Sequence, residues 1–519
     1  MPEYLSPGVY VEETTPGPRP IEGVPTSTAA FLGEAERGPI KPRLVTSVKE
    51  YERWFGGGFG ADKFLPDAVR GFFDNGGKRL VVCRLVGGRA TSAQAAFGDF
   101  GVRASGPGSW GRRVWVRIDD SSTRRPDAAG HAVPVGFRIR VAYWSSASPS
   151  FQPFDPFADA ARLPRPTFEE AFDDLVADAG SADFYEKRLL DHAALVTLIR
   201  RATAKPTARP PNGSAALAEL GADDPAALGE ADYNGAVVAG AARRELQGLA
   251  ALELDDHREV ALIYAPAAAA PVANALVSHC ERLGSRFAVV DCEKGVSNVA
   301  ALEPRMTLAD TSYAAFYFPW LVIRDPQSGA QRSVPPGGHV LGVYARTDME
   351  RGVFKSPANQ AVRGALALEL DIGDAAEATL SPRGVNVIRR FPDRGILVWG
   401  ARTLASDPQW KYVSVRRLFI FLERSIRVGT QWVVFEPNDE DLWARVRRTI
   451  ENFLMLQWRD GALMGETPQK AFFVICDRRT MTQNDLDNGR LVCEIGIAPV
   501  RPAEFVIFRI CHATAPAHR

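Results

Sequence analysis

The chain has 519 residues, which at about 100–200 residues per domain indicates roughly three or four domains. It carries 62 basic and 62 acidic residues, so its formal net charge is zero. This balance argues against a general nucleic-acid binder, which needs a basic excess, and against a strongly charged disordered chain. With 46% hydrophobic residues, the chain is predicted to fold around a substantial apolar core.

The sequence pattern favours a cytoplasmic protein. No run of about 18 apolar residues is present, which argues against insertion into a membrane. The first residues lack the basic and then apolar pattern of a secretion signal. The six cysteines are scattered and form no CxxC pair, so we expect reduced, buried thiols and neither a disulfide framework nor a zinc site.

An extended N-terminal arm is predicted for residues 1–20. Five prolines exclude a helix there, and only one short strand-like stretch lies between them. Successive side chains of a strand point to opposite faces. Val9 and Val11 would therefore share one face of this stretch, and Tyr10 and Glu12 the other.

Residues 21–95 are predicted to be compact and α/β, as the N-terminal part of a core domain. A helical pattern covers 48–55, and an apolar strand covers 78–85 after a turn at 75–77. The glycines around this turn fail the phosphate-loop motif, because the Lys and the following Ser or Thr do not stand at the required spacing. The sequence therefore predicts a tight turn here and no nucleotide site.

Residues 96–165 are predicted to form a small β-sandwich. Segments 114–118 and 137–141 alternate apolar and charged residues, and this period of two is typical of half-exposed antiparallel strands. The polar residues 121–130 would connect the two strands.

Residues 166–375 are predicted to form an α/β domain. A helix is expected over 166–200, because Thr167 and Glu170 have the spacing of a capping box. Residues 201–232 are rich in Ala, Pro and Gly and are expected to form a surface loop.

Apolar strands alternate with helices in the second half of this domain. Strands are predicted over 259–264 and 287–290, with an amphipathic helix over 272–283 between them. This order implies a parallel sheet with helical crossovers.

The C-terminal part, residues 376–519, is predicted to combine helices with short strands. Helices are expected over 415–424 and 439–459, and strands over 395–399, 431–435 and 471–476. The chain then closes with an apolar strand over 504–511. Its residues Phe505, Val506, Ile507 and Phe508 are apolar on both faces, as in a buried central strand.

The sequence contains no recognisable catalytic constellation. It has neither HExxH nor GxSxG. The pairs Asp191-His192 and Asp256-His257 are neighbours in sequence and would seldom point the same way, so we interpret them as surface or cap residues. The acidic residues 439–441 are expected at a helix start, where carboxylates complement the helix dipole. We therefore predict no catalytic residue, no metal and no cofactor.

The second half of the chain also contains an ordered series of short motifs. They are Phe316-Tyr317-Phe318-Pro319-Trp320, Val334-Pro335-Pro336-Gly337-Gly338, Gly342-Val343-Tyr344-Ala345-Arg346-Thr347-Asp348, Trp399-Gly400-Ala401-Arg402-Thr403, Phe435-Glu436-Pro437-Asn438-Asp439 and Pro502-Ala503-Glu504-Phe505. This series resembles the sheath proteins of contractile phage tails and of related bacterial contractile injection particles. The arm residues 7–13 and the segment Pro107-Gly108-Ser109-Trp110-Gly111 are similar to the same family.

The resemblance implies an α/β multidomain fold. A core domain built from both chain ends would carry an inserted β-sandwich and a subtilisin-like α/β domain without a working triad, and extended arms would end the chain. It also implies a structural subunit that forms stacked six-membered rings around an inner tube and contracts to drive that tube through a membrane. The implied partners are other copies, the inner tube, and baseplate and terminal cap proteins, with no direct nucleic-acid contact.

The resemblance further implies that chain ends are exchanged between subunits. The arm strand with Val9, Tyr10, Val11 and Glu12 and the terminal strand 504–511 would complete a sheet in another copy. An ordinary strand within one chain is the alternative. Two other functions also stay open: a hydrolase-like enzyme on the α/β domain, and a different structural subunit of the same particle.

A contact with the inner tube is predicted on the helix over 439–459. Leu442, Val446, Ile450, Phe453 and Leu454 recur at helical spacing and form a buried stripe. A different face carries Arg445, Arg448, Asn452, Met455 and Arg459. Residues 381–460 hold fourteen basic and nine acidic residues, which favours this region as the tube-facing one. A simply solvated face is the alternative. If the C-terminal region faces the tube, residues 96–232 are predicted to face outward, where insertions are tolerated.

Overall fold

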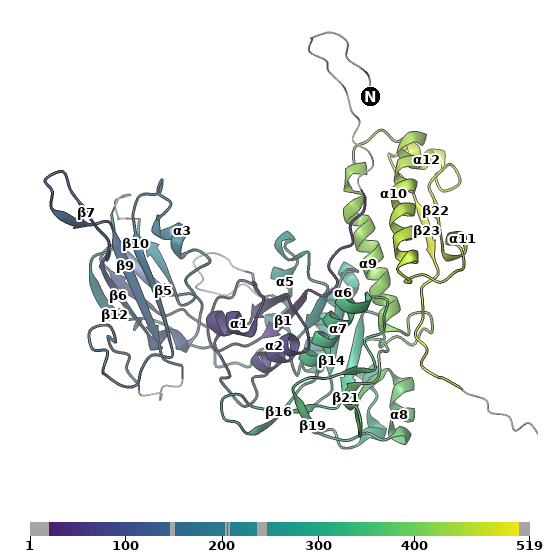
Figure 1. Cartoon of the computed structure of the whole chain (residues 1–519), viewed down its shortest axis with the longest axis horizontal. Helices are drawn as coiled ribbons and strands as arrows, with labels where there is room; N and C mark the ends of the chain where they lie inside the picture. The colour runs from purple at the N-terminus through teal and green to yellow at the C-terminus, as the bar shows by residue number, and fades with distance from the viewer. Residues whose placement is uncertain (1–19, 146–150, 203–204, 206–207, 236–245, 508–519) are drawn as a thin grey trace, which may run out of the picture. The chain divides into compact units, whose positions relative to one another are not determined.

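The computed structural model describes residues 20–145, 151–202, 205, 208–235 and 246–507 (Figure 1). Residues 25–416 form one compact unit. The described residues 20–24 and 417–507 belong to a second unit, and the division between the units falls inside helix α9 (Val413–Gly429).

A nine-stranded sheet forms the centre of the larger unit. Its strands, in spatial order, are β18 (Gln360–Ala361), β21 (Gly395–Val398), β20 (Val385–Phe391), β15 (Ala314–Phe318), β14 (Phe287–Asp291), β13 (Leu262–Tyr264), β1 (Ala29–Gly33), β3 (Leu80–Arg84) and β2 (Arg43–Val45). The six strands from β20 to β3 are parallel, and every residue of β1, β3, β14 and β15 is buried. The predicted parallel sheet is thus confirmed, and its continuous apolar strands fit a sheet covered on both faces.

Helices connect and cover these strands. They are α1 (Val48–Phe55), α2 (Leu65–Asp74), α4 (Glu230–Asn234), α5 (Gly248–Leu252), α6 (Ala270–Leu283), α7 (Gly337–Arg351) and α8 (Asp374–Leu380). The predicted helices over 48–55 and 272–283 are confirmed as α1 and α6, and the turn over 75–77 follows α2 as expected. A separate three-stranded sheet contains β17 (Gln331–Val334), β16 (Leu321–Arg324) and β19 (Ala365–Leu368).

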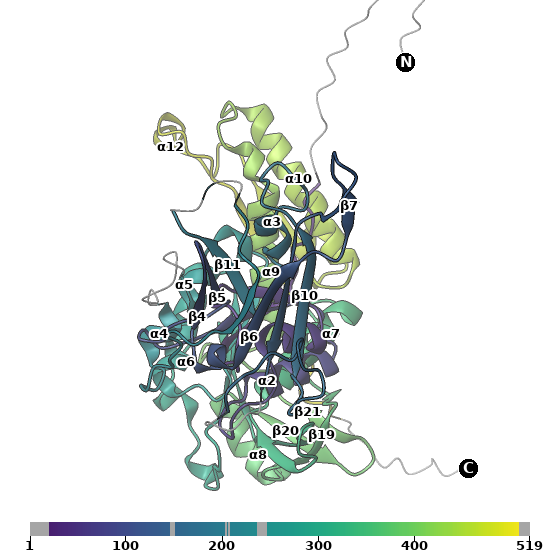
Figure 2. The ribbon, with the colours of Figure 1, turned by 90° about the vertical axis from the view of Figure 1, so that its left-hand side faces the viewer.

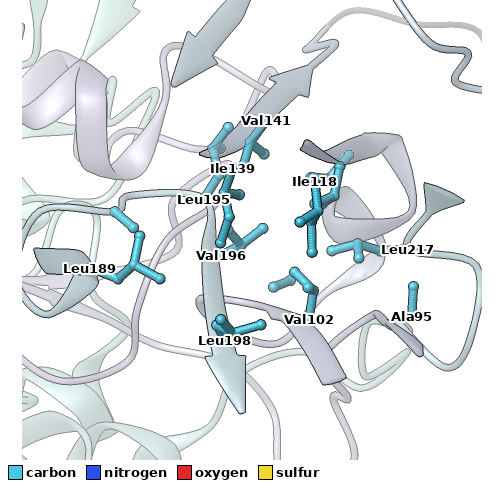
Figure 3. Packing of buried hydrophobic residues seen from close by; sticks show 14 of the residues in the cluster. Ala95, Val102, Ile118, Ile139, Val141, Leu189, Leu195, Val196, Leu198 and Leu217 are labelled. Carbon is cyan, nitrogen blue, oxygen red and sulfur yellow. The ribbon is translucent and has the colours of Figure 1, made fainter. Parts of the chain in front are cut away.

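Two antiparallel sheets share one apolar core in the part of the chain from residue 93 to 217. One sheet contains β10 (Phe168–Leu175), β9 (Phe137–Tyr143), β6 (Val114–Asp120) and β12 (Gly213–Ala216), and the other contains β11 (Val196–Arg200), β5 (Phe100–Ala104) and β4 (Gln94–Phe97). Val102, Ile118, Ile139, Val141 and Leu198 gather between them (Figure 3). The predicted strands over 114–118 and 137–141 are confirmed and pair with each other.

A short helix and a hairpin complete this region, which faces the viewer in Figure 2. They are α3 (Tyr185–Leu189) and the strands β7 (Arg124–Pro126) and β8 (Ala132–Pro134).

The predicted helix over 166–200 is wrong, because this segment begins with strand β10. The Thr167 amide donates to the Tyr143 carbonyl at 2.8 Å, and β10 then pairs with β9. The Glu170 carboxylate does not cap a helix but accepts hydrogen bonds from the amides of Ala194 and Leu195 at 3.0 Å. Pairing with a distant strand therefore overrides the local capping pattern.

The predicted surface loop over 201–232 is also wrong in part. Its residues Gly213–Ala216 form β12, which pairs with β6. Strands from 168–216 thus belong to the same two sheets as strands from 94–143, so the sheets extend across the boundary predicted at residue 165.

The smaller unit is built around α9 and α10 (Glu440–Arg459). It also contains α11 (Pro468–Ala471), β22 (Phe472–Ile475), α12 (Gln483–Asp487) and β23 (Glu494–Ile497). The predicted helices over 415–424 and 439–459 and the strand over 471–476 are confirmed. Residues 20–24 join this unit, where the Val24 amide donates to the Ser425 hydroxyl at 3.1 Å.

The predicted strand over 431–435 is wrong. Gln431–Val433 form a single 3-10 turn, and Phe435 lies fully exposed with a φ of 71°. The apolar run is too short and too exposed to pair, and it connects α9 to α10 instead.

Candidate assembly surfaces

The β22–β23 sheet has only two strands. They pair antiparallel from Phe472 opposite Ile497 to Ile475 opposite Glu494. Within the described ranges no further strand joins either edge. A two-stranded sheet is marginally stable by itself, so its open edges can accept further strands.

The C-terminal segment after this sheet forms no strand in residues 501–507. Phe505, Val506 and Ile507 are 77%, 70% and 78% exposed. Three consecutive exposed apolar side chains form a segment that is available for contact with another surface. The predicted residues Val9, Tyr10, Val11, Glu12 and Phe508 lie outside the described residues.

Helix α10 presents the five residues predicted to contact a tube. Arg448, Asn452 and Arg459 are exposed, whereas Arg445 and Met455 are half-buried. Their alternating spacing of three and four residues places all five along one side of the helix.

Arg445 already has partners inside the unit. Its guanidinium lies 3.2 Å from the Glu436 carboxylate and stacks over the Trp432 ring, with 5.5 Å to the ring centroid. Arg448 and Arg459 are therefore the more available basic residues of this face.

The opposite side of α10 forms the core of the unit. All five residues of the predicted stripe are buried, namely Leu442, Val446, Ile450, Phe453 and Leu454. The stripe is confirmed, and it fixes which side of α10 faces solvent.

The acidic residues 439–441 initiate α10, as predicted. The Asp439 carboxylate accepts a hydrogen bond from the Leu442 amide at 2.8 Å. The Asn438 side chain accepts another from the Trp443 indole at 2.7 Å. The motif at residues 435–439 thus serves as a helix start.

The two acid–His pairs lie in ordinary structural surroundings, in an ion pair, a hydrogen bond and a turn. Asp191 pairs with Arg43 at 3.2 Å, and the His192 carbonyl accepts a hydrogen bond from Arg53 at 2.8 Å. Asp256-His257 lies in a 3-10 turn. Over the part of the chain that the structure describes, no group of three His, Cys, Asp or Glu residues is placed to hold a metal ion. In the same part, no helix has the length and apolar character needed to cross a bilayer.

Sequence reasoning missed one pair of functional candidates, Cys476 and Cys493. The two thiols contact each other at the end of the β22–β23 sheet. Sixteen residues separate them in the sequence, so no spacing motif reveals the pair. A signal was nevertheless present, since each cysteine borders an apolar segment.

Two family models match the chain. The model of the phage tail sheath protein central domain matches residues 229–404, and that of the phage tail sheath C-terminal domain matches residues 405–511. Together they cover more than half of the chain.

Proteins with similar sequences are also tail sheath proteins. A prophage major tail sheath protein of Pseudomonas aeruginosa is 26% identical over 197 residues, which are 37% of this chain and 49% of that protein. The match thus spans about half the length of this relative. The tail sheath protein of Burkholderia phage BcepMu is 23% identical over 481 residues, which are 88% of this chain and 87% of that protein.

A solved structure shares the fold. The PVC sheath complex of an extracellular contractile injection system, in its contracted state, is 23% identical with a TM-score of 0.59. The alignment covers 98% of each chain. The mixed α/β, multi-sheet architecture described above is therefore that of a sheath protein.

Proposed function

Because the chain belongs to the phage tail sheath family, we propose that its copies polymerise as stacked six-membered rings around an inner tube. The predicted role as a structural subunit of a contractile sheath, and not as an enzyme, is confirmed by this family. The finer proposal adds that the sheath contracts and drives the tube through a target membrane. Assembly would take place in the cytoplasm of the producing bacterium.

Exchange of chain ends is the proposed link between subunits. The exposed apolar segment Phe505–Ile507 carries this proposal, since nothing in the described part of its own chain pairs with it as a strand. The β22–β23 sheet offers the complementary feature, since no other strand among the described residues joins it. A donated strand adds main-chain hydrogen bonds, each worth about 1 kcal/mol net, and such bonds survive rotation of the domains that they connect.

The N-terminal arm would donate the second strand. Residues 20–24 run along α9 in the same unit as the β22–β23 sheet, so the arm starts beside this unit. The strand with Val9, Tyr10, Val11 and Glu12 would then reach the sheet of another copy, and Phe508 would extend the strand donated by the C-terminus.

The experiment that tests the link is co-expression with the inner tube protein, followed by electron microscopy. We expect cylinders from the full chain and none from a chain that lacks residues 1–15 or from the double variant Val506→Asp, Phe508→Asp. Val133→Asp, on the exposed hairpin strand β8, serves as a control and should leave assembly intact. Normal, contracting cylinders from the truncated chain would overturn the proposed exchange.

The exposed face of α10 is the proposed tube contact. Exposed ion pairs contribute about 0–1 kcal/mol each, so many weak contacts can hold the sheath in register and still release together. Met455 would pack against the tube, Asn452 would hydrogen-bond to it, and Arg448 and Arg459 would pair with acidic tube residues, with Arg445 as a weaker contributor.

Reversal of the charges on the exposed face of α10 can distinguish a loss of tube binding from a loss of folding. We expect Arg448→Glu with Arg459→Glu to abolish assembly on the tube while the subunit keeps its melting temperature. Lys470→Glu, an exposed basic residue of α11 in the same unit, is the matched control. Normal assembly of the double variant would contradict the tube contact.

Contraction requires no cofactor or nucleotide in this proposal. Two packings of the same subunits differ in free energy, and a plug at the baseplate holds the less stable one until a signal arrives. A population shift from 1:99 to 99:1 needs only about 5.5 kcal/mol, which many copies supply together.

A further inference from the structure

The β22–β23 sheet ends at a pair of cysteines. The last paired residues are Ile475 and Glu494, so the register places Cys476 opposite Cys493 where the loop 477–492 begins and ends. Residues directly opposite in an antiparallel pair have Cα atoms about 4.5–5.5 Å apart. Disulfides occur at Cα separations of about 4.4–6.8 Å, so two cysteines that continued this register by one residue would lie within that range.

The two thiols differ in their surroundings. Cys476 is 1% exposed, whereas Cys493 is half-buried. A hydrogen bond from Cys493, together with the nearby Arg447 guanidinium of α10, holds the pKa of the Cys476 thiol below its usual range, against the effect of burial. The same hydrogen bond and burial raise the pKa of Cys493. The lowered pKa favours the thiolate form of Cys476, and the contact between the two thiols places Cys493 against it as a second sulfur.

The other described cysteines lack these features. Cys83, Cys280 and Cys292 are buried, and burial raises the pKa of each thiol. A buried thiol with a raised pKa is inert toward oxidants. The Cys476–Cys493 pair is therefore chemically distinct within the described part of the chain.

We propose that Cys476 and Cys493 form a peroxide-reactive dithiol that closes as a disulfide across the end of the β22–β23 sheet. The Cys476 thiolate attacks hydrogen peroxide, the O–O bond breaks, and hydroxide leaves to become water, which gives a sulfenic acid. Cys493 then attacks this sulfur and the S–O bond breaks. One disulfide and two water molecules result from two thiols and one peroxide.

The disulfide would covalently link β22 to β23, the two strands of the sheet that would accept donated strands. This consequence rests on the proposed function. In the reducing cytoplasm the sheet would assemble in its dithiol form. Oxidation after release of the particle would then tie β22 to β23, so that strands donated by neighbours cannot pull the two apart.

Peptide mapping of the full chain tests the chemistry without any need for assembly. The chain is treated with hydrogen peroxide or with dithiothreitol, free thiols are alkylated, and the chain is digested with trypsin. We expect a cross-link between peptides 471–478 and 491–509 after peroxide only, with Cys83, Cys280 and Cys292 still alkylated. In Cys493→Ser we expect Cys476 to be trapped by dimedone as the sulfenic acid. Alkylation of both Cys476 and Cys493 after peroxide, or oxidation of Cys476 to the sulfinic acid alone in the unmodified chain, would overturn the proposal.

Assembled cylinders test the consequence separately. Oxidised cylinders of the unmodified chain should dissociate at a higher urea concentration than reduced ones, and Cys493→Ser cylinders should show no such shift. An equal midpoint for both forms would overturn this consequence. A failure to form cylinders under reducing conditions would count against the proposed function and not against the dithiol.

Discussion

Gly71 of α2 lies directly against the imidazole of His339 in α7. A Cβ at position 71 would overlap Nδ1 of this ring. The same helix pair is close elsewhere, since a Cβ at Gly338 would lie 2.5 Å from the Cα of Ala68. Gly71 of α2 and Gly338 of the Val334–Gly338 motif therefore let α2 and α7 pack closely beside the parallel sheet.

Gly71→Ala is expected to destabilise the protein. Alanine favours a helix over glycine by about 1 kcal/mol, but overpacking against the buried His339 ring costs about 1–3 kcal/mol or more, so the net effect should be a loss. We expect the midpoint of urea-induced unfolding to lie at a lower concentration for Gly71→Ala than for the unmodified chain. Gly88→Ala is the control, because no atom lies within 4 Å of a Cβ placed there. A midpoint above that of the unmodified chain would show that the helices separate easily.

His339 should make the protein sensitive to acid. Burial lowers the pKa of its imidazole from 6.5 to about 4. A group with a lowered pKa stabilises the fold above its unfolded pKa, and this contribution is lost as the pH falls toward the folded value. Between pH 7 and pH 5 the loss should be about 2 kcal/mol.

The test compares the unmodified chain with His339→Gln, which does not titrate. Their difference in unfolding free energy should shrink by that amount from pH 7 to pH 5. His131→Gln, at an exposed position, is the control. A difference that stays constant with pH would contradict the neutral buried imidazole.

Removal of the α10 cap should weaken the start of this helix. Asp439→Ala deletes the carboxylate that accepts from the Leu442 amide, and loss of such a cap costs about 1 kcal/mol. Hydrogen exchange of the amides at 441–443 should accelerate. Asp439→Asn keeps an acceptor and should behave like the unmodified chain, whereas equal exchange in all three proteins would mean that the cap does not stabilise the helix.

Phe435 holds a backbone conformation that few bulky residues adopt. Its φ is 71° and its side chain is fully exposed, so Phe435→Asn loses no contact within the chain and relieves strain of about 1 kcal/mol. The isolated subunit should melt at the same temperature or a few degrees higher. Val434→Asn, at the exposed neighbour, should bring no gain, and a drop in melting temperature for Phe435→Asn would reveal a contact made by the ring.

Local periodicity predicted much of this fold correctly. The buried stripe of α10, helix α1 and the alternating strands β6 and β9 each follow a pattern that a few neighbouring residues define. Periodicity reports which side of an element is buried, and that depends on residues close in sequence. The family was recognisable for the same reason, since its motifs are short and occur in a fixed order.

Long-range pairing could not be predicted in this way. Thr167 and Glu170 have a helix-start pattern, yet Tyr143 and the amides of Ala194 and Leu195 satisfy them in a sheet. Only a partner distant in sequence decides between these states.

The sequence by itself thus determined the family, the helices with a clear apolar face and the absence of a catalytic motif. The tertiary structure alone decided three other features: the strand at β10, the meeting of Cys476 with Cys493, and the exposure of Phe505–Ile507. The physical reason is that register and exposure depend on what lies opposite each residue in space, and a local pattern contains no information about that.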